Sequence, residues 1–282
     1  MNLFSGLEKF GFGSEESMRL YEEEQKNAKS REAEKNKEEE QEEAALILQK
    51  TTCCKVCEHT FKTKAVKSGR ARRLQPDRDL RPRFQYIDTL KYDVVSCPAC
   101  GYTALSRDFD KITPTQAKMV REQISAKFHK SEEPERAVNS YNEAIDLYKL
   151  ALLNTVAKRG KESEKAFICL KLAWVMRGKA DTMAESTPEE KEAKKKCMEE
   201  EEVFYMQAYD GFCKAISQEM FPICGMDEST MDYLLAYMGY HFKKYEIASK
   251  FLANVLTSSS ASRRLKDMAL DLKEDIIAQL RK

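Results

Sequence analysis

Four cysteines arranged as two Cys-x2-Cys pairs constrain this chain more than any other feature of its sequence. They are Cys54, Cys57, Cys97 and Cys100. Two residues between thiols let a tight turn direct both sulfurs at one ion, and two such turns complete a tetrahedral zinc site. In the second pair, Pro98 presets the turn and Gly101 can take the positive φ required after the last ligand. The sequence therefore predicts one structural zinc ion bound by the four cysteines.

Other chemistries of these thiols are possible alternatives. A redox dithiol needs only one Cys-x-x-Cys, at a helix N-terminus, whereas an iron–sulfur cluster could use the same four thiolates. Four thiolates leave no coordination position for water, which argues against catalytic zinc. Cys53 and His59 are close enough in sequence to replace a ligand, although a place beside the site or in solvent suits them better.

The composition indicates a mainly α-helical protein. The 282 residues include only 10 Gly and 7 Pro, while the strong helix formers are plentiful. Charged residues make up 34% of the chain, and no apolar run approaches the about 20 residues that cross a bilayer. Nine cysteines, an odd number, and no signal peptide at Met1 favour the reducing cytoplasm over a secreted, disulfide-stabilised fold.

Changes in composition divide the chain into three predicted parts: a charged N-terminal arm or helix at 1–50, a β-rich zinc-ribbon-like head at 51–112 and an antiparallel helical-repeat body at 113–282. Residues 15–43 carry twelve Glu against six Lys and Arg, as in a solvated helix or a disordered arm. The β-branched and aromatic runs at Phe61–Val66 and Tyr92–Val95 are typical of short strands. We expect the head to fold separately from six or seven helices that follow it.

Helix signals are strong from residue 113 onward. Thr113 and Thr187 are each followed by Pro and, three residues on, by Gln or Glu, which is the capping-box arrangement. Near the C-terminus, the small residues Ala236, Gly239 and Ala248 would allow neighbouring helices to approach closely. This pattern predicts tetratricopeptide-like packing, and an ordinary antiparallel bundle is the alternative.

The stretch between Lys62 and Lys91 is strongly basic, with ten Lys and Arg against three Asp. Such a patch could neutralise phosphates, and Phe84 and Tyr86 within it could stack on bases. In the alternative interpretation, the charge balances the thiolates and the acidic arm, and Arg–Asp pairs order a loop. The candidate nucleic-acid contacts are Arg70, Arg72, Arg73, Arg81 and Arg83.

Several motifs of this chain together resemble a bacterial family known as domain of unknown function 2225. They are Cys54-x2-Cys57, Phe61-Lys62-Thr63, Asp77-x-Asp79-Leu80-Arg81-Pro82, Leu90-Lys91-Tyr92-Asp93-Val94, Cys97-Pro98-Ala99-Cys100-Gly101-Tyr102, Tyr233-Leu234-Leu235-Ala236 and Tyr245 through Phe251. The resemblance extends from about Thr51 to the C-terminus. It implies a zinc-ribbon-like head on a tetratricopeptide-like helical body, with no activity to carry over. Glu58 stands where a Gly is expected, which predicts a less regular first turn.

The sequence contains no Gly-rich phosphate loop, nucleophile elbow, His-Glu-x-x-His or dinucleotide fingerprint, so we expect no enzymatic activity. An enzyme with an unrecognised site is the least favoured alternative. We expect a cytoplasmic adaptor with a zinc-stabilised head, a body that binds a protein, no membrane span and no small-molecule substrate. The candidate partner contacts, on the concave face of the body, are Tyr237, Tyr240, His241 and Lys244. The alternative is a nucleic-acid- or polyanion-binding regulator that uses the basic head.

Overall fold

The computed structural model describes residues 38–130 and 136–281 and divides the chain into two compact units, 1–46 and 47–282. In the first unit, residues 38–45 are helical, and residues 1–37 of the predicted arm lie outside the described residues. The second unit begins at Ile47, so the predicted boundary at residue 51 falls inside its first strand. The account below concerns this second unit.

Two antiparallel hairpins form the β part of the unit. Strand β1 (Ile47–Cys53) pairs with β2 (Thr60–Val66), and β3 (Val94–Ser96) pairs with β4 (Thr103–Leu105). Both hairpins are closed by a Cys-x2-Cys turn, so each pair of thiols lies where the chain reverses. The strands predicted from β-branched runs correspond to β2 and β3, whereas the sequence did not identify β1 and β4.

The described residues from 113 onward form seven α-helices, which confirms the mainly helical prediction. They are α2 (Pro114–Val120), α3 (Tyr141–Ala157), α4 (Glu162–Thr182), α5 (Pro188–Gln218), α6 (Glu228–His241), α7 (Tyr245–Thr257) and α8 (Arg263–Leu280). Complete capping boxes at Thr113 and Thr187 start α2 and α5, as predicted. A π-helical turn, Arg121–Ser125, continues α2. None of the described helices is long and apolar enough to span a membrane.

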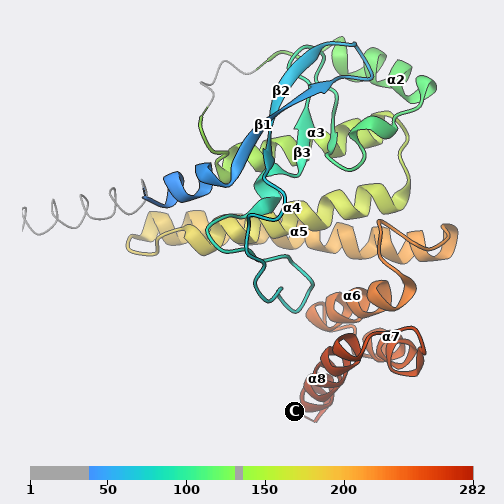
Figure 1. Cartoon of the computed structure of the whole chain (residues 1–282). Helices are drawn as coiled ribbons and strands as arrows, with labels where there is room; N and C mark the ends of the chain where they lie inside the picture. Colours follow the sequence, from blue (N-terminus) through green and yellow to red (C-terminus); the bar gives the residue numbers. More distant parts are fainter. Residues whose placement is uncertain (1–37, 131–135, 282) are drawn as a thin grey trace, which may run out of the picture. The chain divides into compact units, whose positions relative to one another are not determined.

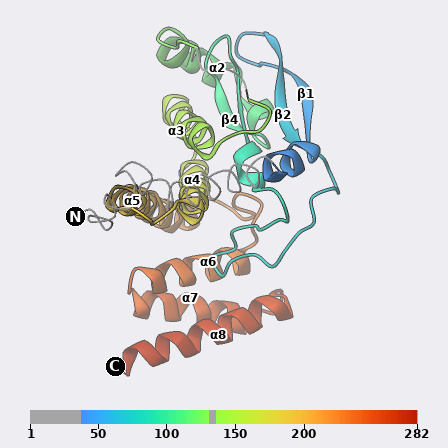
Figure 2. The same ribbon diagram turned by 90° about the vertical axis from the view of Figure 1, so that its left-hand side faces the viewer.

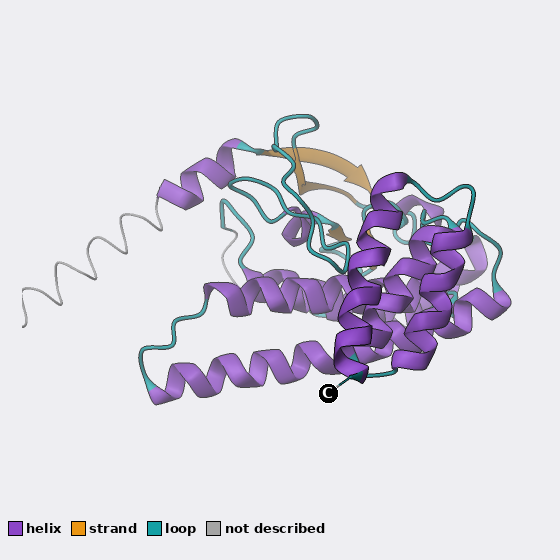
Figure 3. Ribbon diagram, turned by 90° about the horizontal axis from the view of Figure 1, so that it is seen from below, coloured by secondary structure: helices purple, strands orange, loops and turns teal. Residues whose placement is uncertain are grey.

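The strands and helices share their hydrophobic cores. Leu90, Val94 and Leu105 pack into the core that α3, α4 and α5 build, and the β3–β4 hairpin lies against α3 (Figures 1 and 3). A second core joins the cysteine turns to α2 and to Ala157 at the end of α3. The predicted boundary at residue 113 therefore does not separate two compact units.

Helices α6, α7 and α8 pack one against the next around a third core (Figure 2). At Gly239 an added Cβ would lie 3.4 Å from the Cβ of Ala248, so the small residues do allow a close helix approach. The pairing of α6 with α7 agrees with the predicted helical hairpins. Their tetratricopeptide-like repeat character stays a prediction.

Candidate metal centre

The first cysteine turn has a regular backbone. The N–H of Cys54 donates to the carbonyl of His59 at 2.9 Å, and the N–H of Glu58 donates to the carbonyl of Cys54 at 2.9 Å. The N–H of Val56 points at the Cys54 Sγ, 3.4 Å away, where it supports a thiolate. Glu58 takes the left-handed conformation, with φ of 62°. The turn is therefore regular despite the non-glycine residue, and the predicted irregularity is wrong.

The second turn repeats this pattern. The N–H of Cys97 donates to the carbonyl of Tyr102 at 2.8 Å, and the N–H of Gly101 donates to the carbonyl of Cys97 at 2.9 Å. Gly101 has φ of 73°, as the sequence predicted. A Cβ at Gly101 would lie 2.4 Å from the ring of Phe128, so this position requires glycine for space as well as for conformation.

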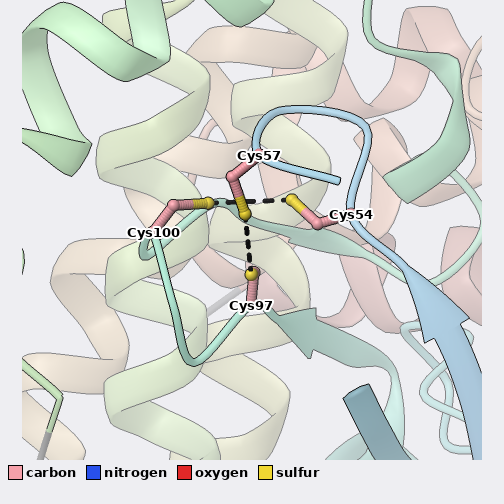
Figure 4. Close-up of side chains that lie close together, drawn as sticks. All are labelled: Cys54, Cys57, Cys97 and Cys100. Atoms are coloured by element: carbon pink, nitrogen blue, oxygen red, sulfur yellow. Dashed lines mark hydrogen bonds between the residues drawn. The ribbon is translucent and has the colours of Figure 1, made fainter. Parts of the chain in front are cut away.

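The two turns bring all four sulfurs together (Figure 4), with every ligand atom within 4.8 Å of the others. The Sγ atoms of Cys54 and Cys100 are 3.7 Å apart, and those of Cys57 and Cys97 are 3.6 Å apart. Four thiolates placed tetrahedrally at about 2.3 Å from zinc would be separated by about 3.8 Å. A disulfide needs about 2.05 Å. The spacing therefore suits a shared metal ion, and all four cysteines are free thiols.

Burial and charge in the cluster also favour a cation. Cys54 and Cys97 are fully buried, and Cys100 is 6% exposed, whereas Cys57 reaches the surface. A hydrogen bond from the Cys100 thiol lowers the pKa of Cys54 to about 5, and burial raises the pKa of Cys97 to about 11. The pKa of Cys100 is raised well above its ordinary value, because its thiol donates a hydrogen bond to Cys54 and because it is buried. Without added positive charge, the sulfurs do not all ionise together, and a bound divalent cation would supply that charge.

Neither alternative ligand joins the cluster. Cys53 is exposed, and its thiol lies 3.6 Å from the carbonyl of Glu58. The exposed His59 ring stacks on Phe61, with 6.3 Å between the centroids. Within the described residues, the group of possible metal ligands consists of the four predicted cysteines alone.

Two polar side chains that the sequence did not single out hold the turns in place. Arg121, in the π-helical turn, donates to the carbonyl of Val56 at 2.6 Å. Asn154, fully buried on α3, donates to the carbonyl of Gly101 at 3.1 Å. Each bond joins positions more than fifty residues apart, so no local sequence signal could have identified either.

The structure separates the predicted basic residues into buried and exposed members. Arg81 is 1% exposed, and its guanidinium lies 3.2 Å from Asp88 and 3.4 Å from Asp181. Its prediction as a nucleic-acid contact is wrong, because phosphate cannot reach it. Arg83 is half-buried, and its Nε lies 2.9 Å from Asp77. That carboxylate raises the pKa of Arg83 and competes with any external anion. The remaining candidates, all exposed, are Arg70, Arg72 and Arg73.

The segment between these arginines is fixed to the helices. Asp79 is 1% exposed and accepts from Trp174 Nε1 at 2.8 Å and Arg177 Nη1 at 2.6 Å. At the other side, Tyr233 donates to the carbonyl of Arg78 at 3.0 Å. The Asp-x-Asp-Leu-Arg-Pro motif is therefore a structural link that ties α4 to α6.

The predicted partner contacts all belong to the end of α6 and the residues after it: Tyr237, Tyr240, His241 and Lys244. His241 is exposed, and its Nε2 lies 2.7 Å from Glu202. Lys244 lies over the ring of Tyr209, 4.2 Å from its centroid. Both tyrosines are half-buried. These side chains make internal contacts and also present part of their surface to solvent.

A family model described as an uncharacterized protein conserved in bacteria, domain of unknown function 2225, matches residues 47–276. The match covers most of the chain and begins at the residue where β1 begins. No curated protein and no solved structure matches the chain.

Proposed function

Because the chain belongs to this bacterial family, whose description names no activity, we propose from its geometry a zinc-stabilised, non-enzymatic adaptor of the cytoplasm. The observation that supports the metal is the cluster of four sulfurs with ligand atoms within 4.8 Å of one another. Zinc fits because it takes four thiolates tetrahedrally and has no redox chemistry of its own. Four protein ligands also close the coordination sphere, which suits a structural ion.

The position of the centre suggests what the ion would stabilise. Its sulfurs come from the turns of both hairpins, and the cysteines share their core with Ala117, Val120 and Ile124. A bound ion would thus connect the β1–β2 hairpin, the β3–β4 hairpin and the start of the helical part. Zinc binding to such a site contributes directly to the free energy of folding.

Elemental analysis of the full chain, purified without added metal, tests the zinc. We expect one zinc per chain, loss of zinc in Cys57→Ser, and full zinc in the neighbouring control Cys53→Ser. Cys57 is the most informative ligand to change because it is exposed, so the protein can stay folded. Iron with sulfide, or zinc content unaffected by Cys57→Ser, would contradict the proposal.

The adaptor part of the proposal places a protein partner on the helices. Stacked helical hairpins expose one face whose side chains need not pack internally and can specify a partner. The residues at the end of α6 fit this role because they are partly exposed and combine aromatic rings with positive charge: Tyr237, Tyr240, His241 and Lys244.

Capture of the partner from the native host, with cross-linking and mass spectrometry, tests this surface. We expect Tyr240→Ala to lose the partner with an unchanged melting temperature. Because Lys244 lies 4.0 Å from Asp210, Lys244→Ala is a cleaner second variant than a charge reversal. A melting temperature that falls together with partner binding would assign these side chains to internal packing and remove them from the proposal.

A further inference from the structure

A cavity of about 710 Å³ lies between the two hairpins and the segment that carries Arg73 and Phe84. Its volume is in the range of about 300–1,000 Å³ that ligand sites occupy. Five cations line it, against the carboxylates of Asp93 and Asp110: Lys50, Lys64, Arg73, Arg107 and Lys171. The cavity therefore has an excess of positive charge.

The β1–β2 hairpin forms one wall. In its register Thr52 is opposite Phe61, and Lys50 is opposite Thr63, so these four side chains share one face. Phe61 packs on Phe109 in the core, with 6.2 Å between the ring centroids. Further along the same face, Lys50 and Thr63 lie outside the core and line the cavity. The inner face of the hairpin thus changes from core packing to a polar wall.

The opposite wall pairs a cation with an aromatic ring. Arg73 and Phe84 form an isolated antiparallel bridge. The flanking bonds, from Leu74 N–H to the Arg83 carbonyl and from Gln85 N–H to the Arg72 carbonyl, are both 2.9 Å. Residues opposite each other in such a non-hydrogen-bonded pair have their side chains close together on one face. A guanidinium and a flat ring therefore stand side by side at the cavity.

Arg73 also lines a neighbouring cavity. A second cavity, of about 490 Å³, is lined by Arg73, Leu74, Gln75 and Arg264 at the start of α8. Arg73 lines both cavities, so they meet at this side chain, and we call the two together the groove. Lys50 lines the first cavity, Arg264 lines the second and Arg73 lines both.

The charges in the groove are unequally neutralised. Lys171 is paired with Asp93, so this pair adds no net charge. Among residues 38–130 and 136–281, no carboxylate forms an ion pair with Lys50, Arg73 or Arg264. Cations without a carboxylate partner, placed in a concave surface, are available to an external anion.

We propose that single-stranded nucleic acid binds along this groove, with phosphates on Lys50, Arg73 and Arg264 and one base stacked on Phe84. This role is separate from the adaptor function. Cations in both cavities fit the successive phosphates of a strand, and the partly exposed ring of Phe84 fits an unpaired base. A duplex keeps its bases stacked inside, so its phosphates could be bound but Phe84 could not stack. An acidic peptide would use the cations and leave the ring without a partner.

Fluorescence anisotropy with labelled oligothymidylate and oligouridylate, measured on the full zinc-loaded chain, tests the groove. We expect the affinity to fall as the salt concentration rises. The slope of log binding constant against log salt concentration should be smaller in Lys50→Glu/Arg73→Glu, by about 0.7 for each phosphate that is no longer neutralised. The matched control Lys195→Glu/Lys196→Glu makes the same charge change on α5 and should bind like the unaltered chain. Phe84→Leu should weaken binding by about 5- to 150-fold, because Leu keeps the apolar volume but cannot stack.

Three results would overturn the proposal. One is that Lys50→Glu/Arg73→Glu and the control Lys195→Glu/Lys196→Glu weaken oligonucleotide binding equally, which would reveal a general effect of net charge. Another is tighter binding of a duplex of the same length. The third is a polyglutamate peptide that competes as well as the oligonucleotide while Phe84→Leu changes nothing, which makes the groove a site for acidic protein segments. Zinc content and melting temperature are measured for every variant, so that a change in binding is never confused with loss of the fold.

Discussion

The two cysteine turns have the same backbone hydrogen bonds, and in each the residue after the second thiol takes the left-handed conformation. They differ in their surroundings. The first turn places Cys57 and Glu58 at the surface. The second is buried in the core beside α3, with Asn154 bonded to Gly101. The geometry of a ligand pair thus depends on its local turn, whereas the cost of altering it depends on what packs against that turn.

The largest expected difference is between cysteines of the two turns. Cys57→Ser should lose zinc and loosen the β1–β2 hairpin while α3 to α8 stay helical. Cys100→Ser should lose zinc and also place a hydroxyl in the core shared with Ala117 and Val120, at a total cost above about 5 kcal/mol. Circular dichroism melts and hydrogen exchange distinguish the two outcomes. Equal, local loosening in both variants would mean that the turns are equivalent.

This expectation revises what the sequence alone predicted, which was a head that folds separately from the helices that follow it. Residue spacing identified the four ligands because two residues between thiols is a local requirement. The shared cores are not local: Leu90 reaches the first core and Ala157 the second through contacts between distant segments. Sequence patterns therefore identify the chemistry of the site better than the packing around it.

A second contrast concerns the left-handed positions. Gly101→Ala should destabilise the protein by about 2–4 kcal/mol, since the new Cβ is strained at φ of 73° and meets the ring of Phe128. Glu58→Ala should change stability by less than about 0.5 kcal/mol, because both residues carry a Cβ and the site is exposed. Urea unfolding of both variants measures the difference. Adding Phe128→Ala to Gly101→Ala should recover part of the loss, and strict additivity would exclude the contact as its cause.

The two polar side chains that hold the turns in place, Asn154 and Arg121, give a smaller contrast. Asn154→Ala removes a fully buried donor to Gly101 and should cost about 1–3 kcal/mol. Arg121→Ala removes an exposed side chain that donates to Val56, and should cost about 0.5–1 kcal/mol. Chemical denaturation of the zinc-loaded proteins gives both values. A larger loss of stability in Arg121→Ala than in Asn154→Ala would contradict the expectation that altering the second turn costs more than altering the first.

The smallest expected effect is a gain. Glu58→Gly should stabilise the protein by about 0.5–1 kcal/mol, because glycine takes a φ of 62° without the strain of a Cβ. Thermal melting at constant zinc concentration detects it. Destabilisation would show that the Glu58 side chain contributes more than its backbone conformation costs.

Other differences between sequence and structure have the same physical origin. Strand β1 carries polar side chains on both faces, with most of its residues exposed, so it shows no alternating apolar pattern. Its stability comes from pairing with β2, and this pairing leaves no pattern in the sequence of β1 itself. Arg81 was predicted at the surface from its charge, yet one of its partners, Asp181, is a hundred residues away. By contrast, the Thr-Pro helix starts were predictable because a capping box is complete within four residues.

The central claim is that the two turns hold one zinc ion through four sulfurs, and zinc K-edge X-ray absorption spectroscopy tests it most directly. The account predicts four sulfur neighbours at about 2.3 Å and no nitrogen or oxygen neighbour. In Cys57→Ser, any zinc retained should show three sulfurs and one oxygen. A spectrum of the unaltered protein with a nitrogen ligand, which would indicate His59, or with fewer than four sulfurs, would contradict the account.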